Sequence, residues 1–273
     1  AELLGGCGRP VEVHRSSGVG DLETRVGRHV ADGHNLIVVA GGDGSVHEAT
    51  NGILGAGGEA SLGVVPTGTG NDFAKACDIP LDWEHAAQLL AERIAAGQGA
   101  RLIDVGRMNH RYFANGAGIG FDARVTSIAR SYRMPIGDLV YLLAIFRGVV
   151  EGIATPRMRI MGDELIWDGP LTLANIANGP WEGGMFHIAP MASNSDGQFD
   201  LMIAGPVSRG RIFTLLPTLM SGKHLGEKEI THEPVRRLTV EAEEPVLCHL
   251  DGEIQPPLQR LEISLLPGAL QLL

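Results

Sequence analysis

Two glycine-rich turns in the first third of this 273-residue chain have the residue types that bind phosphate. The first turn, 41–44, reads Gly-Gly-Asp-Gly and follows the apolar residues 36–39. Backbone N–H groups at the start of a helix attract anions, and glycine removes the side chains that would keep a phosphate away. Asp43 adds a carboxylate beside that phosphate, so the turn predicts phosphoryl chemistry assisted by a divalent cation. A glycine turn without a ligand is the alternative.

The second turn starts at Pro66, which ends a predicted strand over 61–65 because proline cannot donate to a sheet ladder. Residues 67–70, Thr-Gly-Thr-Gly, combine hydroxyls for phosphate or ribose with glycines that allow a close approach. Asn71 or Asp72 is a predicted cap for the helix that follows. Because the carboxyl ends of adjacent parallel strands meet at one edge of a sheet, the two turns are expected to form one site.

A third set of reactive side chains lies near the other end of the chain, at Asp251-Gly252-Glu253. In an extended segment, residues two positions apart share a face, so both carboxylates are predicted to point to the same side. One carboxylate would accept the proton of a hydroxyl group, and the other would hold or orient Mg²⁺. An Asp-Gly hairpin turn on the surface is the alternative.

The stretch GGDGSVHEATNG (41–52), followed by PTGTGNDFA (66–74), closely resembles the catalytic domain of diacylglycerol kinases, sphingosine kinases and soluble bacterial lipid kinases. Two further elements, PMASNSDGQFD (190–200) and LDGE (250–253), follow in the family's order, so the resemblance covers nearly the whole chain. It implies an ATP- and Mg²⁺-dependent kinase of lipid metabolism. Such a kinase transfers the γ-phosphoryl group to the hydroxyl of a diacylglycerol-like lipid, a phosphatidylglycerol or a sphingoid base.

The resemblance also implies roles for individual residues. It makes Glu253 the proton acceptor and Asp251 its helper. It implies that one set of residues lines the nucleotide phosphates: Ser16, Gly41, Gly42, Asp43, Gly44, Ser45, Val46, His47 and Thr69. In bacterial relatives the Asp-Gly loop holds Mg²⁺ at positions that match Ser193, Asp196 and Gln198, the first and last through backbone carbonyls. Such a loop of oxygen ligands also suits Ca²⁺. A hairpin without a cation is the alternative here.

Two other functions share part of this pattern. NAD kinases have the same Gly-Gly-Asp-Gly turn and would phosphorylate a soluble dinucleotide. A non-catalytic nucleotide-binding sensor is the third reading, because the Asn-Pro-x-x-Gly phosphate loop with which relatives begin is absent from residues 1–273. Either the phosphate loop precedes residue 1 or the protein lacks one nucleotide contact. The retained Asp251 and Glu253 favour an enzyme.

The order of apolar segments predicts two domains. A strand over 11–15, then alternating helices and strands as far as about residue 105, predict an α/β domain with a Rossmann-like parallel sheet. Short strands dominate 106–266 and predict a mostly antiparallel β-sandwich, with residues 267–273 packing back on the first domain. A helix over 46–54 would carry Glu48 and Asn51 on one face, where local pairing and function are equally open.

Charge, cysteine spacing and the length of the apolar runs argue against several binding partners and cellular locations. The formal charge of −10, from 32 acidic and 22 basic residues, argues against nucleic acid as a partner. Cys7, Cys77 and Cys248 are far apart and predict free or buried thiols in a reducing cytosol. The longest apolar run, 139–146, is too short to span a membrane. We therefore expect a cytoplasmic protein that meets its lipid substrate at the membrane surface, as a monomer or a homodimer.

Overall fold

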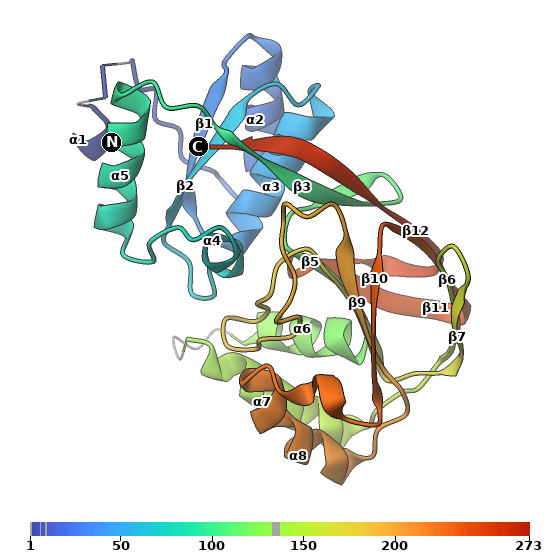
Figure 1. Cartoon of the computed structure of the whole chain (residues 1–273). Helices are drawn as coiled ribbons and strands as arrows, with labels where there is room; N and C mark the ends of the chain where they lie inside the picture. The colour runs from blue at the N-terminus through green and yellow to red at the C-terminus, as the bar shows by residue number, and fades with distance from the viewer. Residues whose placement is uncertain (1, 6, 9, 133–136) are drawn as a thin grey trace.

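The computed structural model describes residues 2–5, 7–8, 10–132 and 137–273. The first part is a small α/β layer structure (Figure 1). Its helices and central strands are α1 (Glu2–Gly5), α2 (Asp21–Ala31), β1 (Leu36–Gly41), α3 (Asp43–Gly55), β2 (Ser61–Pro66), α4 (Asp72–Ala76) and α5 (Trp83–Ala95). Strands β1 and β2 pair in parallel, from Leu36 opposite Ser61 to Gly41 opposite Pro66. The predicted α/β domain with a parallel sheet is therefore confirmed.

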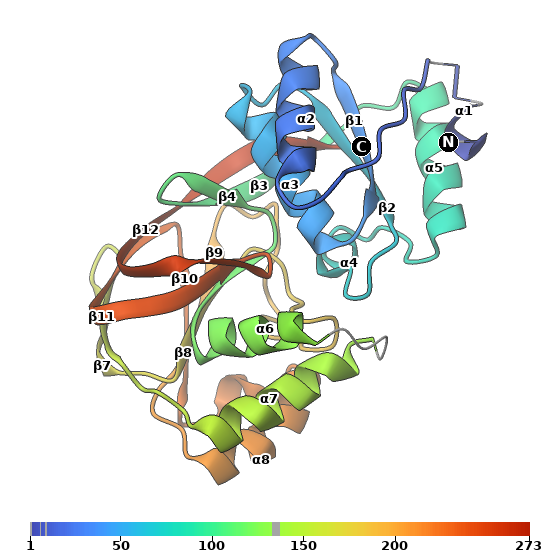
Figure 2. The same cartoon turned by 180° about the vertical axis from the view of Figure 1, so that it is seen from behind.

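The two faces of β1 belong to different apolar clusters. Ile37 and Val39 pack in the cluster that includes α3, whereas Leu36 and Val38 pack in the cluster that includes α5. Successive strand residues point to opposite faces, so a continuous apolar run is what a strand covered by helices on both sides needs. Figure 2 shows α2 and α3 on one side of β1 and β2, and α5 on the other.

The second part is built mainly of antiparallel strands. Its elements are β3 (Arg101–Met108), β4 (Arg111–Phe113), β5 (Gly116–Gly120), α6 (Phe121–Ser131), α7 (Leu139–Glu151), β6 (Arg157–Met161), β7 (Leu165–Pro170), β8 (Leu173–Ala177), β9 (Phe199–Ala204), α8 (Arg209–Met220), η1 (His224–Gly226), β10 (Ile230–Val235), β11 (Arg237–Leu250) and β12 (Glu253–Leu272). The stacked rings of Phe113 and Phe199, 5.4 Å apart, lie in the core of this sandwich-like sheet. The expected antiparallel second part is thus also confirmed.

Strand β12 joins the two parts. It pairs antiparallel with β11 and β3, and its end pairs in parallel with β2, where Gln271 lies opposite Ser61 and Leu272 opposite Leu62. The end of the chain therefore lies against the α/β part (Figure 1). The domain boundaries at residues 105 and 266 stay a prediction.

Several elements differ from the expectation. Residues 11–15 form no strand, because their alternating side chains are exposed and find no strand to pair with. Helix α3 begins at Asp43 rather than at Val46, so the Asp-Gly-Ser of the motif forms its first turn. Strand β11 is long and continuous rather than short, and its pairing with β12 shifts register between Glu241 and Val246 and again between Val246 and Cys248.

Membrane-spanning helices and cysteine pairing can be examined in the part of the chain that the structure describes. No helix in this part is long and apolar enough to cross a membrane. The three cysteines are free and buried, as the absence of paired spacing predicted.

Candidate active site

The two glycine turns are in backbone contact. They follow β1 and β2 at the same edge of the sheet, and the Thr67 amide donates to the Gly41 carbonyl at 3.0 Å. A Cβ on Gly42 would lie 2.9 Å from the Cα of Gly68, and a Cβ on Gly68 would meet the Cα of Gly42. Only glycine lets the turns approach this closely, which is the physical reason for both motifs.

The start of α3 is open to an anion. Gly42 is its N-cap, and no side chain caps the helix. The first amides of a helix have no intrahelical acceptor, and the positive end of the helix dipole lies beside them. Ser45 lies over Gly41, where a Cβ would collide with its side chain. We call the start of α3 and the two glycine turns the phosphate cradle; phosphate binding there stays a prediction.

The Asp251–Gly252 segment is a two-residue hairpin turn between β11 and β12. Both residues have positive φ, 49° and 82°, and Leu250 pairs with Glu253 across the turn. Asp-Gly favours this mirror-image turn, because both central residues must adopt left-handed conformations. The prediction of an extended segment with both carboxylates on one side is therefore wrong. The turn sends the two carboxylates to different partners.

Asp251 is a buried acceptor at the centre of the site. One carboxylate oxygen accepts the amides of Asn115 and Gly116 at 2.8 and 3.0 Å. The other accepts the Ala114 amide at 2.9 Å and lies 2.9 Å from Nδ1 of His47. Burial alone would raise the pKa of Asp251, but the hydrogen bonds from His47 and the backbone hold that pKa below its usual value.

Glu253 faces the first turn of α3. Its Oε1 lies 3.0 Å from the position that a Cβ on Gly44 would take. Arg130, from the last turn of α6, donates to the same Oε1 at 2.7 Å and to the Gly252 carbonyl at 3.1 Å. The structure thus brings the predicted base to the predicted phosphate cradle. Sequence reasoning gave Arg130 no place here, since a single arginine in a helix carries no spacing signal.

Two polar residues of α3 turn out to be structural. The Glu48 carboxylate accepts the amides of Gly20 and Glu23 at 2.9 and 3.2 Å, so it caps the start of α2. The Asn51 side chain exchanges hydrogen bonds with both backbone groups of Tyr112 on β4. These contacts fix α3, and with it His47 and the glycine turn, on the rest of the sheet.

Two buried carboxylates stand beside the cradle. Asp43 accepts the Phe73 amide at 2.9 Å, and Asp72 accepts the Gly184 amide at 3.1 Å. Burial raises the pKa of Asp43, and burial together with the charge of Asp43 raises the pKa of Asp72 to about 6. Lys75, 3.4 Å from Asp72, is the neighbouring cation. Carboxylates that are desolvated and repel each other are a fitting environment for a hard divalent cation.

Asp72→Asn is expected to change how stability depends on pH. Because the folded-state pKa of Asp72 is raised from 3.8 to about 6, the folded state holds its proton more tightly than the unfolded state. This group's contribution is therefore full below the unfolded pKa and is lost as pH rises through 6. Urea denaturation should show the variant gaining up to about 3 kcal/mol over wild type as pH rises from about 3 to about 7.

The exposed Asp78, which already has the positive φ that Asn tolerates, supplies a matched Asp78→Asn control with no such gain. A difference between wild type and Asp72→Asn that stays constant across this range would contradict the raised pKa.

Of the remaining predicted phosphate residues, Thr69 and Ser16 are exposed, whereas the Val46 side chain is buried in the apolar core and does not line the phosphate site. Thr69 lies at the surface of the second turn, with its Cγ2 3.9 Å from the position that a Cβ on Gly137 would take. The Ser16 hydroxyl donates to the Gly18 carbonyl of its own loop at 3.0 Å. The roles assigned to these two hydroxyls stay predictions.

The 193–198 loop is ordered by its own contacts and by a residue the sequence did not single out. Asp196 accepts the Gln198 amide at 3.2 Å, and the Ser193 hydroxyl lies 3.3 Å from that of Ser195. The buried Asp104 accepts the amides of Gly197 and Gly268 at 2.8 Å each. The cation expected at Ser193, Asp196 and Gln198 stays a prediction.

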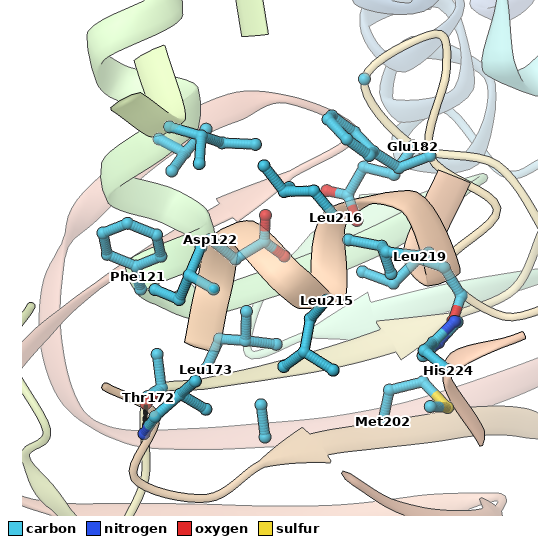
Figure 3. Close-up of a pocket in the computed structure, with 18 of the residues that line it drawn as sticks. Phe121, Asp122, Thr172, Leu173, Glu182, Met202, Leu215, Leu216, Leu219 and His224 are labelled. Carbon is cyan, nitrogen blue, oxygen red and sulfur yellow. Dashed lines mark hydrogen bonds between the residues drawn. The ribbon is translucent and has the colours of Figure 1, made fainter. Parts of the chain in front are cut away.

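An apolar cavity of about 130 Å³ lies under α6, α7 and α8, against β8 and β9. Figure 3 shows the carboxylates of Asp122 and Glu182 among apolar side chains, from Phe121 and Leu173 to Leu215, Leu216 and Leu219. Burial and the charge of Asp122 raise the pKa of Glu182 to about 7. The cavity is therefore apolar with one acidic corner.

His249 connects that acidic corner to the Asp251–Gly252 hairpin. Its Nε2 lies 2.9 Å from Glu182, and its Nδ1 accepts the Gly252 amide at 3.2 Å. Because an amide only donates, Nδ1 accepts that hydrogen bond with its lone pair, and the ring proton lies on Nε2, facing Glu182. His249 thus links Glu182 at the cavity to Gly252, which directly precedes Glu253 in the chain.

Comparison with known proteins assigns a class to this fold and site. Residues 1–108 match the model of the diacylglycerol kinase catalytic domain, and residues 116–273 match that of the YegS C-terminal NAD kinase beta sandwich-like domain. The chain therefore belongs to the diacylglycerol kinase family of lipid kinases, as its motifs implied.

Individual relatives extend over nearly the whole chain. A "Probable lipid kinase YegS-like" of Pseudomonas aeruginosa is 34% identical over 268 residues, which cover 97% of this chain and 85% of that protein. The "Diacylglycerol kinase" of Mycobacterium tuberculosis is 34% identical over 256 residues, 89% of this chain and 78% of that protein. The crystal structure of a diacylglycerol kinase from Bacillus anthracis superposes with a TM-score of 0.73 at 22% identity, covering 100% and 88% of the two chains, and shows the same fold.

Proposed function

We propose that this protein is an ATP- and Mg²⁺-dependent kinase that phosphorylates the hydroxyl of a diacylglycerol-like lipid. The observation that carries the proposal is the position of Glu253, whose carboxylate lies against Gly44 at the open start of α3. A base must be within reach of both the acceptor hydroxyl and the phosphoryl group for in-line transfer. Relatives named diacylglycerol kinase support the lipid class, with phosphatidylglycerol and sphingoid bases as the other acceptors.

The proposed mechanism assigns one task to each part of the site. The Gly42 and Gly68 turns and the α3 amides hold the nucleotide phosphates. Glu253 accepts the proton of the lipid hydroxyl, and Arg130 positions the Glu253 carboxylate. Asp251 holds His47 and the 114–116 backbone in place. Asp43 would hold Mg²⁺ beside the cradle, where the ion would supply positive charge against the phosphoryl group.

The apolar cavity is the proposed seat of an acyl chain. It is lined by helices α6, α7 and α8, and its acidic corner is connected through His249 to the Asp251–Gly252 hairpin. A lipid with its chain in this cavity would present polar head atoms toward Asp122 and Glu182, near Glu253. An apolar cavity with a few polar groups at one end is typical of ligand pockets.

A product analysis tests the proposal. Purified protein is incubated with labelled ATP and Mg²⁺, in separate reactions with diacylglycerol, phosphatidylglycerol, sphingosine or NAD. Label in the diacylglycerol product is expected. Label only in another lipid keeps the lipid kinase and changes its substrate, whereas label only in NADP supports the NAD kinase reading. Nucleotide binding without turnover on any acceptor supports the sensor reading.

Helix α7 is the proposed contact with the membrane that carries the substrate. Four large apolar residues on one face, Leu139, Leu143, Phe146 and Val150, are 55%, 43%, 58% and 59% exposed. Their spacing of four, three and four residues places them in a single stripe. The same helix lines the cavity through Tyr141 and Ile145, so an exposed stripe and a lipid pocket share one element. Cytoplasmic location and oligomeric state stay predictions.

Phe146→Glu is expected to lower activity on diacylglycerol in vesicles by about tenfold or more. A charge in the middle of the stripe opposes burial of this face in the interface, where apolar area supplies the binding free energy. Sedimentation with vesicles of phosphatidylcholine and diacylglycerol should show the same loss of binding. Met191, 65% exposed on the loop before β9, supplies the matched control Met191→Glu. Equal losses in both variants, or none in Phe146→Glu, would remove α7 from the interface.

A further inference from the structure

A group of potential metal ligands lies away from the kinase site, around the last turn of α2. One ligand atom from each of Glu12, His29 and His34 lies within 4.8 Å of the others. A third imidazole flanks them, since the ring centroids of His14 and His29 are 4.9 Å apart and His14 Nε2 lies 3.5 Å from Glu12. Imidazoles with one carboxylate form the donor set of zinc and its neighbours in the first transition row.

The ring of His34 is already held as a metal ligand is held. Its Nδ1 lies 3.0 Å from the backbone carbonyl of His29. A carbonyl only accepts, so Nδ1 carries the proton and Nε2 keeps a free lone pair. Metal-binding histidines usually donate their second ring N–H to a carbonyl or carboxylate, which fixes the tautomer in this way.

The local charge also suits a cation. His29 stands in the last turn of α2, where the helix dipole is negative. Glu12 adds a full negative charge on the facing segment, and its carboxylate is 69% exposed. A divalent cation would therefore gain from both the helix end and the carboxylate.

A second group of potential metal ligands among the described residues consists of Asp122, Glu182 and His249. The hydrogen bond of its histidine ring argues against a metal site there. There the Gly252 amide donates to Nδ1, so Nε2 carries the proton and offers no lone pair to a metal. The contacts of His249 therefore need no ion, whereas those of His34 leave its Nε2 lone pair free to bind a metal.

We propose that Glu12, His29 and His34 form a zinc site, with His14 or a water as the fourth ligand. Ligand atoms around tetrahedral zinc lie about 3.3 Å apart, which small rotations of these exposed or half-buried side chains can reach. Residues 10–16 have no regular secondary structure, and Ser16 follows the site directly. The ion would join this segment to α2 and so fix the loop that enters the α2 N-terminus.

Isothermal titration of tag-free protein with zinc chloride tests the site. Wild type is expected to bind one ion, and His29→Ala and His34→Ala should each weaken binding about tenfold or more. The exposed His85 on α5 supplies the control His85→Ala, with affinity unchanged. Wild type that does not bind zinc, or His29→Ala and His34→Ala variants that bind like wild type, would overturn the proposal.

Trypsin cleavage gives a second readout that does not depend on a large change in stability. Arg15 is exposed and lies within the joined segment. Zinc should slow cleavage after Arg15 in wild type and in His85→Ala, but not in Glu12→Gln or His34→Ala. Cleavage that is slowed equally in all four proteins would place the zinc elsewhere and sink the assignment.

Discussion

Replacing Glu253 with Gln is expected to lower kcat on diacylglycerol by about 10²–10⁴-fold, the usual contribution of a positioned general base. The amide has nearly the shape of the carboxylate and still reaches the start of α3, but it cannot accept the hydroxyl proton. ATP affinity should stay close to that of wild type, because Glu253 is assigned to the acceptor and not to the nucleotide. Steady-state kinetics and ATP titration measure the two quantities separately.

Glu262→Gln on the same strand is the matched control, since that side chain is 65% exposed and pairs only with Arg260 at 3.1 Å. It should leave kcat unchanged. If Glu253→Gln turned over like wild type, Glu253 would not be the base. If it lost ATP binding instead, the residue would belong to the nucleotide site.

The local half of this site is predictable from the sequence. Gly42 and Gly68 each follow an apolar strand, and glycine spacing alone indicates a turn that a backbone or a phosphate can approach. Parallel pairing of β1 and β2 then brings the turns together, because the carboxyl ends of neighbouring parallel strands share an edge. That step requires only that β1 and β2 are adjacent parallel strands.

The contacts in this site between residues far apart in the sequence follow from no local sequence pattern. His47 and Asp251 are 204 positions apart, and only the closed fold shows that they touch. The sequence places an Asp-Gly pair near residue 251 but does not tell an extended segment from a hairpin. The two conformations differ in the sign of φ at Asp251, and they direct its carboxylate to different places. The position of Arg130 and the apolar cavity cannot be predicted for the same reason, since each depends on the packing of α6 against distant elements.

The helix boundary at Asp43 shows how tertiary contacts decide between local options. Sequence pattern placed the helix start three residues later, at Val46. In the structure Asp43 instead accepts the amide of Phe73 and joins the first turns of α3 and α4. Helix ends are set by where their free amides and carbonyls find partners, and those partners lie in another motif here.

Asp251→Ala is expected to lower the free energy of unfolding by about 3–5 kcal/mol, because it leaves several buried donors without an acceptor. The amides of Ala114, Asn115 and Gly116 all donate to this carboxylate, whose side chain is 3% exposed. Asp251→Asn keeps one acceptor oxygen and should lose less. Urea denaturation with linear extrapolation measures each value.

The exposed pair of Asp163 with Arg237 supplies the control for this prediction. Asp163→Ala removes a carboxylate that is 82% exposed and should change stability by less than about 1 kcal/mol. The contrast follows from solvation: water replaces the partner of an exposed charge, but nothing replaces the acceptor of a buried amide. An Asp251→Ala protein as stable as Asp163→Ala would show that the hairpin relaxes freely and that Asp251 does not hold the 114–116 backbone in place.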